Sequence, residues 1–167
     1  MRKIMFTLVV SFYAAGLLAQ SGSTLKSDVA FKDAKVEMAY RNYLQLKDAL
    51  VASKADGAKE AAGKLKISLA SLNDGNPDRY RDAMTQAMKI TKASTMEEIR
   101  KSFASLSTEM KVVVKEGQLS KGMIYVEHCP MANNNTGADW LSNEKEIKNP
   151  YFGEKMLKCG SVKETIH

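Results

Sequence analysis

The sequence contains little of what common catalytic and cofactor-binding motifs require. It has two cysteines, Cys129 and Cys159, and two histidines, His128 and His167. It lacks a CxxC redox pair, a CxxCH haem attachment motif, an HExxH zinc motif and a glycine-rich phosphate loop. His128 and Cys129 are adjacent, so in an extended chain they face opposite sides and do not form a nucleophile–base pair. We therefore expect that the protein is not an enzyme.

Strong positive charge and long hydrophobic runs are also missing. The net charge of +6 is mild and argues against a nucleic-acid-binding protein. One apolar run, Ile4–Ala19, follows the basic residues Arg2 and Lys3 and is too short to span a membrane. We interpret residues 1–19 as a secretory signal peptide. Residues 20–167 are then predicted to form one periplasmic or secreted domain, with no membrane span after cleavage.

Residues 26–116 are rich in alanine, lysine and methionine and repeat apolar side chains with the period of a helix. A first helix is predicted over Ser27–Ser53. Asp56 is a candidate N-cap for a second helix. Asn76 and Pro77 mark the end of the second helix and the start of a third. Asn76 is its predicted cap and Pro77 its first residue. The three predicted helices follow one another through short connections.

A fourth helix is predicted to start at a capping box, in which Glu98 reaches back to the amide of Thr95, and to end at Gly117. Because each predicted helix has an apolar and a polar face, an up-down four-helix bundle is the economical packing. The predicted fold class is therefore all-α. The bundle is followed by an irregular C-terminal motif segment and by a short final helix, which begins at Asn149-Pro150 and carries Cys159.

The C-terminal segment holds two clusters of sulfur-containing residues. Cys129 and Met131 are two residues apart beside His128, and Met156 and Cys159 are three apart on the predicted final helix. If that helix folds back, two thiolates and two thioethers converge near an imidazole. Such a donor set favours Cu(I), and Ag(I) by similarity, over hard ions that prefer oxygen. The sequence therefore indicates a candidate soft-metal site made of these five residues.

A disulfide between Cys129 and Cys159 is the alternative, because export would place both thiols in an oxidising compartment. It would close a loop of about 30 residues and stabilise the fold by about 3–4 kcal/mol. In that case the methionines are packing residues and no metal is bound. The protein would then be a disulfide-stapled binding module whose partner docks on the bundle or near Trp140. The residues alone leave both possibilities open.

The C-terminal motifs resemble a family of exported bacterial domains of unknown function, which occur alone or attached to adaptor subunits of Cus-type heavy-metal efflux pumps. The resemblance runs from about Ala34 to Glu164. It is specific in three stretches, which read YVEHCPM at 125–131, GADWLS at 137–142 and NPYFGEKMLKCG at 149–160.

This resemblance implies copper handling in the periplasm. It places Cys129, Met131, Met156 and Cys159 on the recurring motif, with His128 beside them. The implied function is Cu(I) or Ag(I) binding, for buffering or for delivery to a heavy-metal efflux adaptor or another copper-handling protein. No nucleic-acid partner is expected.

Overall fold

The computed structural model describes residues 29–72 and 74–167. The predicted signal peptide and Ser27 lie outside the described residues. The predicted first helix is wrong over residues 29–33, because Ala30–Phe31 is a strand and the helix begins at Ala34. The helices are α1 (Ala34–Val51), α2 (Ala55–Ala70), α3 (Arg81–Lys92), α4 (Met96–Glu116) and α5 (Ala132–Asn135), and η1 (Gly153–Met156) is a 3₁₀ turn. The strands are β1 (Ala30–Phe31), β2 (Leu119–Lys121), β3 (Ile124–Cys129), β4 (Ala138–Ser142) and β5 (Ser161–Ile166).

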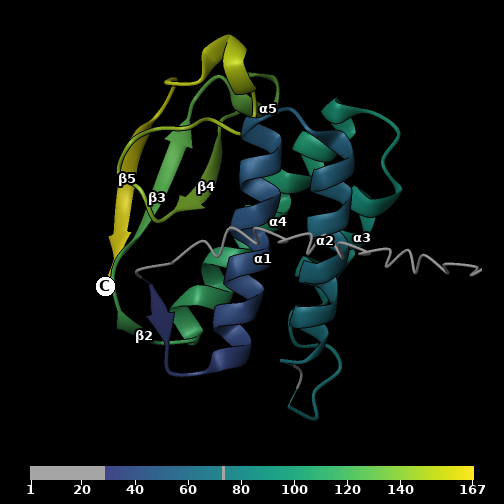
Figure 1. Ribbon diagram of the computed structural model, residues 1–167, viewed down its shortest axis with the longest axis vertical. Coiled ribbons are helices and arrows are strands. Elements are labelled where there is room, and N and C mark those ends of the chain that lie inside the picture. The colour runs from purple at the N-terminus through teal and green to yellow at the C-terminus, as the bar shows by residue number, and fades with distance from the viewer. Residues whose placement is uncertain (1–28, 73) are drawn as a thin grey trace, which may run out of the picture.

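The molecule combines a four-helix layer with a small sheet, so the all-α prediction is wrong. Helices α1 to α4 each pack against the next helix in the chain. An antiparallel sheet of order β4-β3-β5 lies beside them and packs against α4, while β1 and β2 form a second, two-stranded sheet (Figure 1). The protein is a mixed α and β structure in which the C-terminal segment is mostly strand.

Side chains on both faces of β4, an outer strand of the three-stranded sheet, are buried. Trp140 and Leu141 are neighbours on β4 that point to opposite faces, and both are fully buried. The Leu141 amide donates to the Tyr43 hydroxyl of α1 at 3.0 Å, which ties the outer edge of β4 to the helices. The Trp140 ring packs against Tyr151, with ring centroids 5.9 Å apart. Strands buried on both faces lose the alternating polar pattern that identifies a strand in sequence.

The predicted start and end of the fourth helix are confirmed. The Thr95 hydroxyl accepts from the Glu98 amide at 3.2 Å, and the Glu98 carboxylate accepts from the Thr95 amide at 3.2 Å. Gly117 is the C-terminal cap of α4. The reciprocal capping satisfies amides that a helix N-terminus otherwise leaves unpaired.

The predicted starts of the second and third helices are wrong. Asp56 lies inside α2, whose N-cap position is Lys54. Helix α3 begins only at Arg81, because Tyr80 adopts a left-handed conformation with φ 59°. The Tyr80 hydroxyl donates to Glu116 of α4 at 2.6 Å. Asn76 does accept a hydrogen bond from the Asp78 amide at 3.0 Å, but the residues that follow it form a turn and not the first turn of α3.

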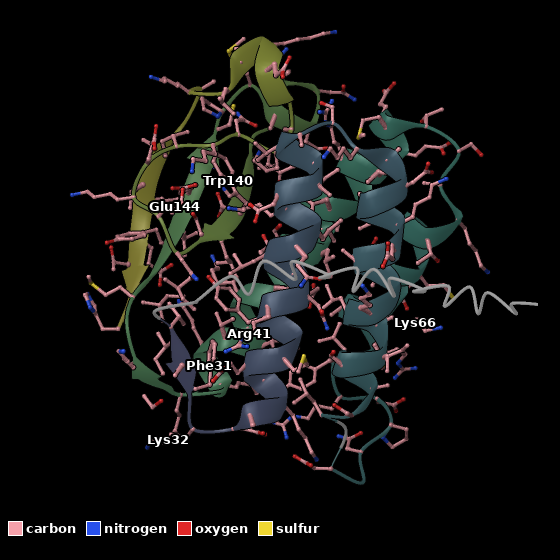
Figure 2. All side chains as sticks on the ribbon, in the orientation of Figure 1. Phe31, Lys32, Arg41, Lys66, Trp140 and Glu144 are labelled. Carbon is pink, nitrogen blue, oxygen red and sulfur yellow. The ribbon has the colours of Figure 1, made fainter. Side chains whose placement is uncertain are left out.

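A series of aromatic rings joins the helices to the sheet. Side chains fill the space between the two layers (Figure 2). Successive ring centroids lie 5.4–6.3 Å apart along the series Phe31, Tyr40, Tyr43, Phe103, Tyr151 and Trp140. These contacts fix the C-terminal segment on the helices, and this segment carries the candidate site.

Within the described residues, none of the helices is long and apolar enough to cross a membrane.

Candidate metal centre

The structure brings the two cysteines together. Cys129 is the last residue of β3 and is buried, while Cys159 lies between η1 and β5 and is partly exposed. Both are free thiols, and their Sγ atoms are 3.2 Å apart, although the residues are 30 positions apart in the chain. The hydrogen bond to Cys129, followed by burial, raises the pKa of the Cys159 thiol. A metal ion that binds both sulfurs therefore has to displace protons.

Asn149 holds the segment that carries Cys159. Its side chain is fully buried, donates to the Cys159 carbonyl at 2.7 Å and accepts from the Tyr151 amide at 2.8 Å. Its own amide donates to the Leu157 carbonyl at 2.8 Å. These three hydrogen bonds close the loop between residues 149 and 159, so the position of the Cys159 sulfur depends on one asparagine.

Gly160 allows the chain to pass closely over the sheet after Cys159. Its φ is +139°, and a Cβ atom there would lie 2.8 Å from the His128 carbonyl oxygen and 2.9 Å from the Trp140 ring. A side chain at this position would be strained and would overlap both neighbours. The glycine therefore lets the second cysteine reach the end of β3.

The two methionines lie on the segments next to the thiols but are not buried with Cys129. Met131 is 46% exposed and lines a surface cavity, and Met156 is partly exposed at the end of η1. The final helix predicted from Asn149-Pro150 is wrong, since η1 is a single 3₁₀ turn that ends before Cys159. The helical spacing that placed Met156 and Cys159 on one face therefore does not apply.

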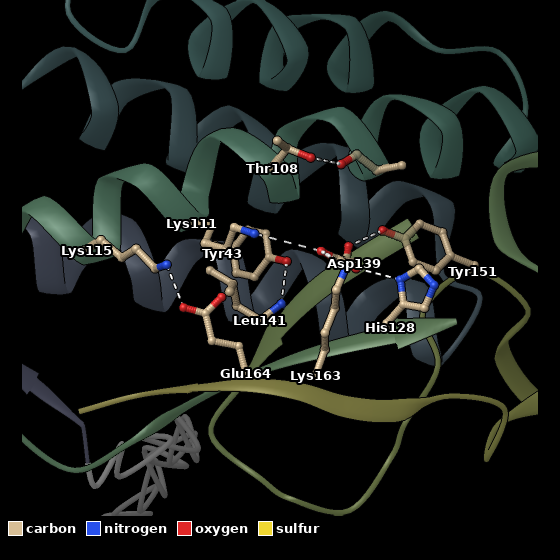
Figure 3. A network of polar contacts seen from close by, with 11 residues as sticks. Tyr43, Thr108, Lys111, Lys115, His128, Asp139, Leu141, Tyr151, Lys163 and Glu164 are labelled. Carbon is tan, nitrogen blue, oxygen red and sulfur yellow. Dashed lines mark hydrogen bonds and ion pairs between the residues drawn. The ribbon is translucent and has the colours of Figure 1, made fainter. Parts of the chain in front are cut away.

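His128 is engaged elsewhere. Its Nδ1 lies 2.6 Å from Asp139 Oδ1, across the β3–β4 pair (Figure 3). Because neighbouring residues of a strand face opposite sides, His128 points away from Cys129. Lys111 of α4 and Lys163 of β5 approach the other carboxylate oxygen of Asp139, at 3.9 Å and 3.8 Å. The imidazole thus belongs to a polar network between the sheet and α4.

A buried carboxylate lies on the same strand as the cysteine. Glu127 is fully buried, and neither of its carboxylate oxygens has a hydrogen-bond partner in the part of the chain that the structure describes. Trp140 lies opposite Glu127 on the paired strand, and its Nε1 is also buried without a hydrogen-bond partner among the described residues. Burial raises the pKa of Glu127 to about 7, against the opposing effect of the Lys47 charge. This carboxyl group therefore keeps its proton to a higher pH than an ordinary glutamate.

Sequence reasoning did not single out Glu127, Asp139 or Asn149 as site residues. The sequence predicts a helix start at Asn149-Pro150, whereas the Asn149 side chain holds a loop. A signal for Asn149 was present, because an asparagine before a proline commonly bonds the backbone two residues later. No comparable local signal exists for Glu127, whose burial depends on strand pairing.

Metal ligands of the ordinary kinds do not cluster in residues 29–72 and 74–167. These residues contain no group of three or more histidine, cysteine, aspartate or glutamate side chains arranged to hold an ion. The thiol pair offers two donors. Any further ligand would have to come from Met131, from Met156 or from a second molecule that binds the same ion. That donor set is limited to sulfur, which suits a soft ion rather than Mg²⁺ or Ca²⁺.

Comparison with known proteins identifies a family but no described relative. No curated protein and no solved structure matches the chain. A family model described as a protein of unknown function, DUF3347, matches residues 39–122. The matched part extends from α1 to the end of β2, whereas both cysteines lie beyond it. The match spans half of the sequence, and the chain belongs to the DUF3347 family of proteins of unknown function.

Proposed function

We propose that this is a periplasmic or secreted protein that binds Cu(I), or Ag(I), between Cys129 and Cys159. The observation that carries the proposal is the 3.2 Å separation of two unbonded sulfurs from distant parts of the chain. Two convergent thiols are a suitable starting point for a soft monovalent ion, since thiolate ligands select Cu(I). Zinc is less suitable, because its structural sites take four ligands and thioethers bind it poorly.

Binding is an exchange of protons for metal with no change in oxidation state. The two thiols release their protons to solvent, and one Cu(I) ion joins both sulfurs. Met131 and Met156 then supply neutral thioether donors by turning their partly exposed side chains toward the ion. His128 joins as a further donor only if it leaves Asp139, so we assign it a secondary role.

The biological role that fits this chemistry is buffering of the ion or its delivery to an efflux or assembly partner. The support for this role is the resemblance of the C-terminal motifs to domains attached to Cus-type heavy-metal efflux adaptors. The secretory interpretation of residues 1–19 supports the periplasm or the exterior as the compartment.

The test is a titration of the reduced protein with Cu(I), in competition with a chromogenic Cu(I) chelator. We expect one ion per chain. The double variant Cys129→Ser, Cys159→Ser should bind Cu(I) more than about 100-fold more weakly. Removing only a residue that hydrogen-bonds to a metal ligand commonly costs 10–100-fold in metal affinity, and these variants remove the ligands themselves. Unchanged affinity in that variant would reject the site.

Methionine variants test the thioether donors. Met131→Leu with Met156→Leu should lower the affinity by about tenfold, since leucine keeps the volume and removes the soft donor. The matched control is Met38→Leu with Met88→Leu, which changes two exposed methionines on α1 and α3. An equal effect of the two pairs would exclude Met131 and Met156 as ligands.

The second candidate is a disulfide-stapled binding module without metal. The same short distance between the sulfurs favours it, because a small movement of either side chain would allow a bond. Counting the free thiols of protein taken directly from its compartment separates the two. No free thiol, together with no Cu(I) uptake after reduction, supports the module and rejects the metal proposal.

A further inference from the structure

The two thiols of the candidate metal centre differ in their access to solvent. Cys129 has 0% of its surface exposed, whereas Cys159 is partly exposed. Cys129 ends β3 and pairs with Ala138 of β4, so the sheet fixes its backbone. A reagent dissolved in water can therefore approach Cys159 in the folded protein, while Cys129 is shielded from it.

Cys159 lies outside regular secondary structure, between η1 and β5. Its amide donates to the Met156 carbonyl at 3.0 Å, and its carbonyl accepts from the Asn149 side chain at 2.7 Å. These contacts hold its backbone and leave its side chain free to change rotamer. The Cys159 sulfur can therefore turn toward a reagent and return to its position beside Cys129.

The distance between the sulfurs allows the buried thiol to react with its neighbour. The two Sγ atoms are 3.2 Å apart, and a disulfide bond is about 2.05 Å long. The bond therefore forms when the two sulfurs approach by about 1 Å. Because the attacking group is already in contact with its target, this step is intramolecular and needs no diffusion.

One property of Cys159 acts against fast reaction. The hydrogen bond to Cys129, followed by burial, raises the pKa of the Cys159 thiol, and the thiolate is the form that attacks a disulfide. The rate is lowered by this effect. The order in which the two cysteines react is set by their access to solvent.

We propose that Cys159 is a site of thiol–disulfide exchange, where an external disulfide forms a mixed disulfide that Cys129 then resolves. The exchange rests on the proposed function only for its consequence. Oxidation of the pair removes both sulfur ligands at once, so the protein holds Cu(I) in its reduced form and not in its oxidised form.

The exchange consists of two displacements at sulfur. In the first, the Cys159 sulfur bonds to one sulfur of the external disulfide, whose own S–S bond breaks. The released thiolate takes up the proton that Cys159 lost. In the second, the Cys129 sulfur bonds to the Cys159 sulfur, and the second external thiolate leaves and takes up the proton from Cys129. Two cysteine thiols are oxidised, and one external disulfide is reduced to two thiols.

Single-cysteine variants test the order of the reaction. The probe is oxidised glutathione, added without oxygen at about pH 8 to reduced, metal-free protein. Cys129→Ala should accumulate a mixed disulfide at Cys159, because the resolving thiol is absent. The matched variant Cys159→Ala should react at least about 100-fold more slowly, since its remaining thiol is buried. Mass spectrometry of acid-quenched samples counts the adducts, and equal rates in the two variants overturn the inference.

The unmodified protein gives the same test without any substitution. Less than one equivalent of iodoacetamide should alkylate Cys159 and spare Cys129, as peptide mapping would show. Excess oxidised glutathione should convert the parent to the internal disulfide, release two glutathione molecules per chain and leave no lasting adduct. Equal labelling of the two cysteines, or a mixed disulfide that persists on the parent, overturns the inference.

The external disulfide can belong to a small molecule or to a protein, and a parallel reaction distinguishes them. An oxidised thiol oxidase of the thioredoxin fold replaces oxidised glutathione as the probe with Cys129→Ala. The probe that forms the mixed disulfide faster identifies the source. Failure of both probes to react at Cys159 overturns the inference.

The result is separate from that of the proposed function, because the order of exchange is measured without metal. The oxidised parent should take up no Cu(I), and reduction should restore the uptake. Exchange at Cys159 with no Cu(I) uptake by the reduced protein would retain the exchange site and reject the metal site. Cu(I) uptake with equal labelling of both cysteines would reject the exchange order and retain the metal site.

Discussion

At the scale of single residues, Glu127 is the most unusual side chain of the protein. It is fully buried between strands, and its pKa of about 7 lies well above the ordinary value of 4.5. The folded protein therefore keeps this proton up to about pH 7, whereas the unfolded chain loses it near pH 4.5. Because the folded state binds more protons across that window, its stability must fall as the pH rises from 4.5 to 7.

Glu127→Gln should remove that loss. The amide has nearly the same shape and stays neutral, so the variant should match the parent below pH 4.5 and exceed it by about 3 kcal/mol at pH 8. The measurement is urea denaturation of both proteins from pH 4 to pH 8. Glu60→Gln is the control, because Lys64 lowers the pKa of that exposed carboxyl group and moves its titration below the window. Parallel stability curves for the parent and Glu127→Gln would contradict the pKa assignment.

The site was partly predictable from residue types. The chain has two cysteines, and the methionine beside each of them selected the segments 128–131 and 156–159; the structure brings the two cysteines together. The contact made by the His128 side chain could not be predicted from the sequence, because it depends on Asp139 lying opposite His128 on the paired strand. The local contact of Asn149 with the Tyr151 amide could be predicted from the asparagine before Pro150, but its contact with the Cys159 carbonyl depends on where the chain returns.

At the scale of elements, the end of α4 depends on the absence of a side chain. A Cβ atom at Gly117 would lie 2.5 Å from Cγ1 of Val36, although its φ of −69° is ordinary for any residue. Val36 is buried in the first turns of α1. The glycine is therefore required by packing between α1 and α4 and not by backbone conformation.

Gly117→Ala should destabilise the protein by about 1–3 kcal/mol, as expected for overpacking. Gly63→Ala is the matched comparison, because its Cβ would meet nothing closer than 3.9 Å on an ordinary helix face. That change should stabilise by about 0.5–1 kcal/mol through the helix propensity of alanine. Thermal or chemical denaturation of both variants measures the difference. Val36→Ala should relieve the effect of Gly117→Ala, and equal behaviour of the two glycines would contradict the packing argument.

Helices were easier to predict than strands for a physical reason. The capping box at Thr95 and the apolar period of α4 are local, so they can be recognised in the sequence and are present in the structure. The strands β4 and β5 are short and pair with β3 at a distance along the chain. The sequence predicts an irregular segment there, and only the pairing makes these residues strands. The start of α3 at Arg81 follows the left-handed conformation of Tyr80, which no local pattern predicts.

At the scale of the whole molecule, the thiol pair links two distant parts of the C-terminal segment. Oxidation would close a loop of about 30 residues and raise the free energy of unfolding by about 3–4 kcal/mol in the chain-entropy model. Guanidinium denaturation with and without reductant measures this difference. The Cys129→Ser, Cys159→Ser variant should be insensitive to reductant. Equal stability of the oxidised and reduced parent would mean that closing the bond strains the fold.

The family match and the candidate site occupy different parts of the molecule. The matched residues 39–122 form the helical layer, from α1 through β2, and the thiols lie in the sheet segment that follows. The ring contacts of Tyr151 with Phe103 and of Tyr43 with Phe103 join the two parts into one core. The helical layer therefore acts as the platform on which the sulfur-bearing segment is held.

The location of Cys159 immediately before β5 has a mechanical consequence. β5 is an outer strand of the sheet, and its first residue, Ser161, pairs with His128 next to Cys129. Any bridge between the sulfurs, whether a metal ion or a covalent bond, therefore clamps this strand at its leading end. Fraying of the strand must then start from Ile166, at the opposite end.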